Sequence, residues 1–315
     1  MSDVLLALCP GAVVMAFVFG PAVLFQIFFG VLAAIAAEAL ALWLRNRPIQ
    51  SSLHDLSAIL TGVLLALSIP PLAPWWIVCS GAVFSILIGK QVFGGLGQNP
   101  FNPAMVGFAF LMLSFPRWMT LWPSMHSDFP DALRGWTPLA EALFGNGTSV
   151  IDAVTRATPL TQLHDAWRAG LEVSGFSLTH ISGWVWINLA YLAGGIWLFR
   201  RNVIDKRIVL GMVLALVGGA AIIEMLSSSS AYVWSSLLLG STMMGIFFIA
   251  TDPVSAANTP RGRWIYGAGI GGLMLLIRRY GGYPDGLAFA VLTMNFIAPT
   301  LDRLATHQAL NRARR

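Results

Sequence analysis

Two carboxylates, Glu38 and Glu224, lie within long apolar stretches of the sequence. Acidic side chains are costly inside a bilayer, and those that occur there often mark ion or proton pathways. Each is therefore a candidate for cation or proton passage. The alternative for each is an interfacial or hydrogen-bonded carboxylate with no transport role.

The cysteines and histidines restrict the cofactors that the chain can hold. Cys9 and Cys79 are the two cysteines, and neither has a partner at metal-site spacing, which excludes an iron–sulfur cluster within this chain alone. The five histidines fall in connections or tails: His54, His126, His164, His180 and His307. Haem would need histidines that project from the apolar segments. A flavin remains compatible, because the protein needs only to orient and tune it.

Two glycine-rich stretches each precede an apolar segment. Residues 94–103 read GGLGQNPFNP and residues 281–286 read GGYPDG. Such stretches interrupt helices and free backbone groups for an anion or the polar edge of a cofactor. The alternative is close helix packing alone. The ligand-binding candidates of the first stretch are Gly94, Gly95, Gly97, Asn99 and Asn102. Asp252 and Asp285 are expected to cap or order loops.

Composition identifies the kind of chain that must position these residues. Hydrophobic residues make up 57% of the 315 residues and charged residues 10%, where a soluble domain has about 25% charged residues. A polytopic membrane protein embedded in the lipid bilayer is indicated. No basic stripe suited to nucleic acid is visible, so nucleic-acid binding is not expected.

The hydropathy pattern predicts an all-α protein of about ten transmembrane helices. The expected spans cover approximately residues 3–20, 22–44, 56–70, 74–90, 103–122, 183–199, 208–226, 231–250, 264–279 and 286–302.

Basic residues fix the expected orientation. They cluster in alternate connections, at Arg45 and Arg47, Lys90, Arg200 to Arg207, Arg261 and Arg263, and the C-terminal tail. Because cytoplasmic loops retain Lys and Arg, both termini are predicted to be cytoplasmic and the long connection 123–182 periplasmic, in the inner membrane. Arg278 and Arg279 break the pattern on the other side.

The order of elements suggests a duplication. In each half an apolar segment ending near Pro71 or Pro253 precedes another span, a basic residue and one of the glycine-rich stretches. We therefore predict two inverted five-helix repeats, residues 1–122 and 183–315, separated by the periplasmic loop 123–182. The second repeat includes the basic cytoplasmic tail.

Four stretches of the sequence together resemble one family. They are Gly94–Gly107, Thr251–Val254, Gly281–Gly286 and Asp152–Leu160, which reads DAVTRATPL. The chain resembles the D subunits of Rnf complexes, which are membrane-bound, ion-translocating oxidoreductases that exchange electrons between NADH and ferredoxin. It is more distantly similar to the B subunit of the sodium-translocating NADH:quinone reductase. The resemblance covers nearly the whole chain.

The resemblance implies a covalent FMN on the threonine that ends an S/T-G-A-T type motif, here Thr158. Arg156 replaces the usual glycine of this motif, and an arginine there can pair with the FMN phosphate. Independently, Pro159 biases Thr158 toward an extended backbone that presents its hydroxyl. The similarity to the quinone reductase suggests a second, non-covalent flavin such as riboflavin.

The expected function is that of an electron-carrying subunit of an ion-translocating NADH/ferredoxin oxidoreductase that moves Na⁺ or H⁺. The chain lacks the glycine fingerprint of a dinucleotide-binding unit, so NADH is expected to react on another subunit. The implied partners are membrane, flavin and iron–sulfur subunits of the complex, and a flavin transferase during maturation. The alternatives are an inverted-repeat solute channel or secondary transporter, and a membrane scaffold without a redox role.

Overall fold

The computed structural model describes residues 1–124, 140, 143–145, 155–169, 182–227, 232–283 and 285–313. Most of the predicted loop 123–182, including Asp152, lies outside the described residues. The described part is helical almost throughout. Its only strands, β1 (Trp122–Pro123) and β2 (Thr155–Arg156), pair antiparallel.

The chain forms two compact units, which are described separately. Unit 1 comprises residues 1–99 and 103–158, and unit 2 comprises residues 100–102 and 159–315. The division therefore falls inside the predicted loop, directly after Thr158, and the short segment Pro100–Asn102 belongs to unit 2.

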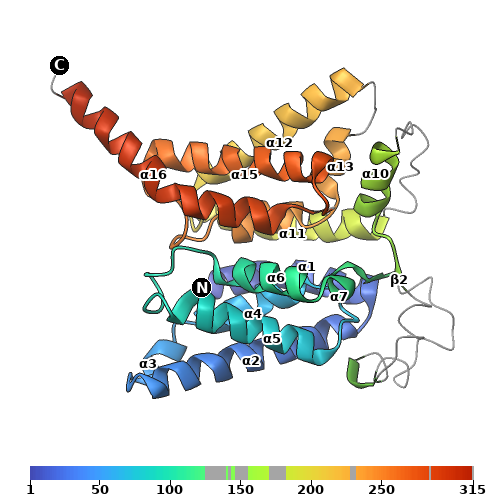
Figure 1. Ribbon diagram of the computed structural model, residues 1–315, viewed down its shortest axis with the longest axis vertical. Helices are drawn as coiled ribbons and strands as arrows, with labels where there is room; N and C mark the ends of the chain where they lie inside the picture. The colour runs from blue at the N-terminus through green and yellow to red at the C-terminus, as the bar shows by residue number, and fades with distance from the viewer. Residues whose placement is uncertain are drawn as a thin grey trace. The chain divides into compact units, whose positions relative to one another are not determined.

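Unit 1 contains the first helices of the chain. They are α1 (Ser2–Phe19), α2 (Ala22–Leu44), α3 (Ile49–Leu53), α4 (Ser57–Ser68), α5 (Trp75–Ile86), the π-helix η1 (Leu87–Gln91), α6 (Pro103–Ser114) and α7 (Pro116–Thr120). Figure 1 shows α2 beside α4 and α5, with which it packs.

Small residues set the spacing of the helices around α2. A Cβ atom on Gly62 of α4 would lie 2.8 Å from the carbonyl oxygen of Gly30 in α2, so the two backbones touch. At the other end of α2, the buried Gln26 side chain donates to the carbonyls of Pro71 and Ala73 in the connection between α4 and α5. That side chain satisfies backbone acceptors which the break between the helices leaves open.

Unit 2 contains the remaining helices. They are α10 (Pro159–Arg168), α11 (Ser182–Arg200), α12 (Lys206–Ser227), α13 (Tyr232–Leu238), α14 (Thr242–Met244), the π-helix η5 (Gly245–Ile249), α15 (Pro260–Tyr280) and α16 (Leu287–Ala313). Helices α12 and α15 pack against each other, and α12 diverges from α15 toward its C-terminal end (Figure 1).

One span of unit 2 is broken. Helix α13 and the continuous segment Thr242–Ile249 differ in direction by 62°. Gly240 lies at the break with φ +66°, a left-handed conformation that glycine adopts without steric cost. The short amphipathic α10 is attached to unit 2 by Leu160 and Leu163, which pack with Leu239.

Proline begins several of these helices. Pro103, Pro116, Pro159 and Pro260 are the first residues of α6, α7, α10 and α15. Proline has a φ suited to the first helical turn and lacks only an N–H that would have no intrahelical partner there. These boundaries are therefore encoded locally.

Hydropathy and length identify a multi-pass membrane protein. Among the described residues, four helices are long and apolar enough to cross a bilayer: Ser2–Phe19, Ala22–Leu44, Lys206–Leu226 and Leu287–His307. The bent pair adds a fifth candidate, and shorter apolar helices cover Ser57–Ser68, Trp75–Gln91 and Pro103–Ser114. Large apolar side chains on these helices face outward, such as Phe17 at 79% exposure, as lipid contact requires.

Each of the ten segments expected to span the membrane contains a helix in the structure. The mainly α-helical membrane class is therefore confirmed. Ten crossings and an inverted relation between the halves remain predictions.

Candidate functional site

A buried ion pair lies within unit 1. Glu38 of α2 and Lys90 of η1 are each 1% exposed, and the Lys90 Nζ is 2.6 Å from the Glu38 Oε1. The Gln91 side-chain amide donates to the same oxygen at 3.0 Å. Charges removed from water in this way persist when they are paired and hydrogen-bonded. We call Glu38, Lys90, Gln91 and Ser57 the Glu38 cluster.

The π-helix η1 positions two members of this cluster. Lys90 and Gln91 are consecutive, yet both side chains reach Glu38. The wide turn of a π-helix changes the direction of side chains relative to the preceding α-helix, and such turns are frequent at functional sites. The charge pattern predicts Lys90 in a cytoplasmic connection; the structure corrects this, because the residue is helical and buried.

The glycine stretch follows η1 directly. Gly94, Gly95 and Gly97 have φ values of +122°, +112° and +88°, which explains why glycine occupies these positions. The Gly94 N–H donates to the Gln91 carbonyl and the Gly95 N–H to the Lys90 carbonyl. Two of the amides expected to face a ligand thus close the end of the π-helix instead.

Two arginines at the end of α2 hold the same turn. Arg45 donates to the Gln91 carbonyl at 2.9 Å and Arg47 donates to the Gly94 carbonyl at 2.9 Å. The glycine stretch is therefore fixed against α2 near the Glu38 cluster. Its role in binding a cofactor remains a prediction.

The asparagines of the stretch are both buried, and Asn102 is bonded within unit 2. The Asn102 N–H donates to the Asn295 side-chain oxygen at 3.0 Å, and its side-chain amide donates to the Ile249 carbonyl at 3.4 Å. Asn295 in turn donates to the Ser255 carbonyl and the Tyr266 hydroxyl. Asn102 therefore orders the region after η5, while a ligand role for Asn99 and Asn102 stays a prediction.

Thr158 lies between β2 and α10. The residue is partly buried, has no regular secondary structure and immediately precedes Pro159, the first residue of α10. This agrees with the non-helical backbone that Pro159 predicts. Arg156, two residues earlier, is exposed at the end of β2.

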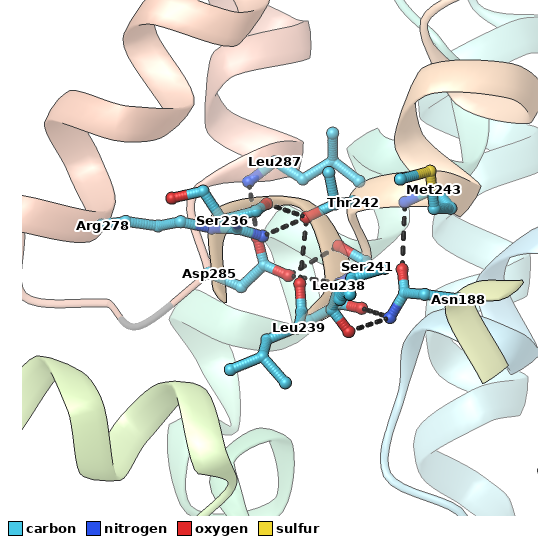
Figure 2. A network of polar contacts seen from close by, with 11 residues as sticks. Asn188, Ser236, Leu238, Leu239, Ser241, Thr242, Met243, Arg278, Asp285 and Leu287 are labelled. Atoms are coloured by element: carbon cyan, nitrogen blue, oxygen red, sulfur yellow. Dashed lines mark hydrogen bonds and ion pairs between the residues drawn. The ribbon is translucent and has the colours of Figure 1, made fainter. Parts of the chain in front are cut away.

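A polar network of unit 2 surrounds Arg278 (Figure 2). The Arg278 side chain is 2% exposed. Its guanidinium donates to the Ser236 carbonyl at 3.0 Å and the Thr242 hydroxyl at 3.0 Å, and lies 3.2 Å from Asp285 Oδ1. The sequence predicts Arg278 in a connection on the non-cytoplasmic side, where a basic residue is an exception to the charge pattern. In the structure Arg278 lies near the end of α15, and it is buried and paired with Asp285.

Asp285 and Asn188 stabilise the break between α13 and α14 (Figure 2). Asp285 accepts from the N–H and hydroxyl of Ser241, and Asn188 donates to the carbonyls of Leu238 and Gly240. Asp285 therefore orders a loop, as the sequence predicts. Burial alone would raise its pKa, but Arg278 and the bonds from Ser241 and Leu287 outweigh this and lower the pKa below its usual value.

Glu224 differs from Glu38 in its surroundings. It is partly buried near the end of α12, and its Oε2 accepts from the N–H of Val233 at 3.1 Å. This contact with the start of α13 matches the structural alternative for Glu224. A role in ion passage stays a prediction for this residue.

The sequence identifies Glu38 as a carboxylate within an apolar segment. It does not identify Lys90 and Arg278 as the buried cations that pair with Glu38 and Asp285. The one signal for them is a basic residue at the same place in both halves, directly before a glycine-rich stretch. Among the described residues, no three His, Cys, Asp or Glu side chains gather as a metal site.

The fold and these clusters define a class: a multi-pass helical membrane protein of two helical units, each with a buried cation paired to a carboxylate. Residues 1–311 match the profile of the NQR2, RnfD, RnfE family, and the chain belongs to this family.

Individual relatives agree with this assignment. The chain is 45% identical to the D subunit of the ion-translocating oxidoreductase complex of Escherichia fergusonii, over 95% of this chain and 90% of the relative. It is 43% identical to the protein of the same name from Citrobacter koseri, over 96% and 91%. The resemblance seen in the sequence motifs is therefore confirmed.

Proposed function

We propose that this chain is a membrane subunit of an ion-translocating oxidoreductase complex and carries electrons through FMN bound covalently to Thr158. The observation that carries the proposal is the placement of Thr158: partly buried, outside any helix or strand, and directly before a helix that starts at Pro159. The family and the names of the relatives support the same assignment.

The residues around Thr158 fit a phosphoester-linked flavin. The threonine supplies the hydroxyl oxygen that the bond requires, and its side chain is partly exposed outside regular secondary structure. Arg156 supplies a positive charge two residues away that suits a phosphate. When bound, a flavin supplies one- and two-electron transfer. The attachment keeps this group with the chain during turnover.

The wider function follows from membership of a complex. Other membrane, flavin and iron–sulfur subunits would supply and accept the electrons, and a flavin transferase would load Thr158 during maturation. Both termini would be cytoplasmic and the loop 123–182 periplasmic in the inner membrane. Na⁺ or H⁺ is the transported ion, with Glu38 and Glu224 as pathway candidates, and a second, non-covalent flavin such as riboflavin remains part of the proposal.

A solute channel or secondary transporter is the second candidate function. The 62° break between α13 and Thr242–Ile249 favours it, because transporters place broken helices at substrate sites. In this chain, however, the polar groups at the break are bonded to Asn188, Arg278 and Asp285. The oxidoreductase names of the relatives favour the first candidate.

The test is the covalent flavin itself. We expect the wild-type band to fluoresce after denaturing electrophoresis when the protein is co-expressed with the transferase. Thr158→Ala should abolish this fluorescence because no oxygen remains for the phosphoester, while Thr158→Ser should retain part of it. Thr161→Ala, on α10, is the matched control and should fluoresce as the wild type does. A wild-type peptide containing residue 158 that carries no FMN mass would contradict the assignment.

A further inference from the structure

The two oxygens of the Glu38 carboxylate differ: one accepts two hydrogen bonds and the other has no hydrogen-bond partner among the described residues. Oε1 accepts from Lys90 at 2.6 Å and from Gln91 at 3.0 Å. Oε2 is buried and has no hydrogen-bond partner within the described part of unit 1. A buried acceptor without a partner is costly, so a cation or proton that bound Oε2 would remove this cost.

Lys90 connects Glu38 to a second carboxylate. Its ammonium donates to the Ser57 hydroxyl at 2.6 Å, and the Ser57 hydroxyl donates to Asp55 Oδ1 at 2.5 Å. Asp55 is partly exposed, whereas Ser57, Lys90 and Glu38 are buried. A continuous chain of polar contacts therefore leads from a partly exposed carboxylate to the buried one.

The backbone before α4 maintains this chain. Leu56 has φ +61°, a left-handed conformation that residues other than glycine adopt only at an energetic cost. It lets Asp55 fold back so that its Oδ1 also accepts the Ser57 N–H at 2.7 Å. Asp55 and Ser57 thus form one fixed group at the start of α4.

Charge compensation restricts what can bind at Glu38. The pair is neutral as it stands, and Arg45 contacts Gln91 rather than Glu38. A second cation beside Lys90 would leave an uncompensated positive charge away from water, which is strongly unfavourable. Binding of a cation therefore requires the Lys90 charge to move away from Glu38, and Asp55 is the carboxylate that Lys90 already contacts through Ser57.

We propose that Glu38 is an exchange site for a monovalent cation, with Lys90 as a tethered counter-ion that shifts toward Ser57 and Asp55 when the cation binds. No covalent bond changes if the cation is Na⁺; if it is H⁺, the proton bonds to Glu38 Oε2. The inference rests on the proposed function, because the complex must move one of these ions. Glu38, Lys90, Asp55 and Arg45 are the charged groups that act on the site.

The test uses the assembled complex in proteoliposomes and measures the cation dependence of electron transfer. Lys90→Met removes the competing charge, so we expect the half-saturating cation concentration to fall by about tenfold, which corresponds to about 1.4 kcal/mol of binding free energy. Asp55→Asn removes the charge that receives Lys90 and should raise that concentration. Lys206→Met, an exposed lysine of unit 2, is the matched control and should change nothing.

Two titrations distinguish Na⁺ from H⁺. If the site binds Na⁺, the half-saturating Na⁺ concentration at fixed pH shifts in both variants. If the site binds H⁺, the midpoint of the pH titration at fixed Na⁺ shifts in both variants. The opposite signs expected for Lys90→Met and Asp55→Asn distinguish exchange from general damage, and Glu38→Gln should remove the dependence. Unshifted titrations in both variants, with Thr158-linked flavin intact, would overturn the exchange site alone. Loss of the flavin assignment would show instead as a non-fluorescent wild-type band.

Discussion

At the scale of residues, Lys90 and Arg278, the two buried Lys and Arg side chains of the described part of the chain, are compensated differently. Lys90 contacts a carboxylate of 1% exposure and leaves one of its oxygens open. Arg278 contacts Asp285, which is 26% exposed and whose oxygens accept from several further donors. The contrast concerns the carboxylates, since Arg278 Nε is also buried without a hydrogen-bond partner among the described residues. A carboxylate with an open oxygen can accept a further ligand, whereas the several donors on Asp285 favour a single arrangement.

Asp285→Asn tests the structural role of the Arg278 network. The substitution leaves Arg278 buried without a counter-charge, and because water reaches Asp285 we expect a loss of about 2 kcal/mol of stability at pH 7. The pKa of Asp285 is lower in the folded than in the unfolded protein, so the ionised carboxylate stabilises the fold fully above its unfolded pKa of about 3.9. This stabilisation is lost as the pH falls through the folded pKa. Thermal denaturation in detergent at pH 7 and near pH 3 measures this difference.

The matched control is Asp165→Asn. Asp165 has a 68% exposed side chain on α10, so its neutralisation should change the denaturation midpoint little at either pH. If Asp285→Asn and Asp165→Asn behave alike at pH 7, the Arg278 network does not stabilise the helix break.

The sequence predicts the carboxylate of the Glu38 cluster but not its partner. Glu38 is conspicuous because it interrupts an apolar stretch, whereas Lys90 lies at the end of one, where a lysine ordinarily reaches the aqueous interface. Counting Lys and Arg along the sequence shows where each basic residue lies in the chain. It does not show which acidic residue of another helix pairs with it. The pairing depends on η1, which turns Lys90 toward α2.

At the scale of elements, helix segments are predicted well and helix irregularities are not. Apolar length and proline mark where α2, α6 and α15 lie. The break at Gly240 is held by tertiary contacts of Asn188 with Leu238 and Gly240, which the sequence does not reveal. Hydropathy averages over a window and cannot resolve a single extra residue in a turn.

Neighbouring glycines of α15 provide a sharp test of helix packing. A Cβ on Gly271 would lie 2.7 Å from the Met212 carbonyl of α12, while a Cβ on Gly272 would meet nothing within 4 Å. Gly271→Ala should therefore force α12 and α15 apart and cost about 1–3 kcal/mol. Gly272→Ala should be neutral or stabilising by up to about 1 kcal/mol, because alanine favours the helix. Thermal denaturation should show a clear loss of stability for Gly271→Ala and none for Gly272→Ala; equal destabilisation would contradict the packing.

At the scale of the whole molecule, the two units share an order of features. Each has a long apolar helix, and each has a buried cation that is followed by a glycine-rich turn. The π-helices do not correspond, because η1 contains Lys90 whereas η5 precedes the helix that carries Arg278. The units differ in which carboxylate pairs with the cation: α2 supplies it in unit 1, and the turn after α15 supplies it in unit 2. The shared cation and glycine-rich turn agree with the predicted duplication, and the proposed ion exchange concerns unit 1 alone.

Orientation in the membrane is the property on which the proposed roles of both units depend. Flavin at Thr158 is expected on the periplasmic side, and the connection after α11, which carries Arg200, Arg201, Lys206 and Arg207, on the cytoplasmic side. Single cysteines report both positions once Cys9 and Cys79 are replaced by alanine. Arg156→Cys and Val203→Cys place exposed thiols in the two regions.

A membrane-impermeant maleimide added to intact cells with a permeable outer membrane should label Arg156→Cys and spare Val203→Cys. Disruption of the inner membrane should expose Val203→Cys, which then serves as its own reactivity control. The expectation follows from charge: moving the basic cluster after α11 across the membrane would oppose the rule that retains Lys and Arg in the cytoplasm. Labelling of Val203→Cys in intact cells would show that the topology is the reverse of the predicted one. Asp55 would then face the periplasm, and a cation would reach Glu38 from that side.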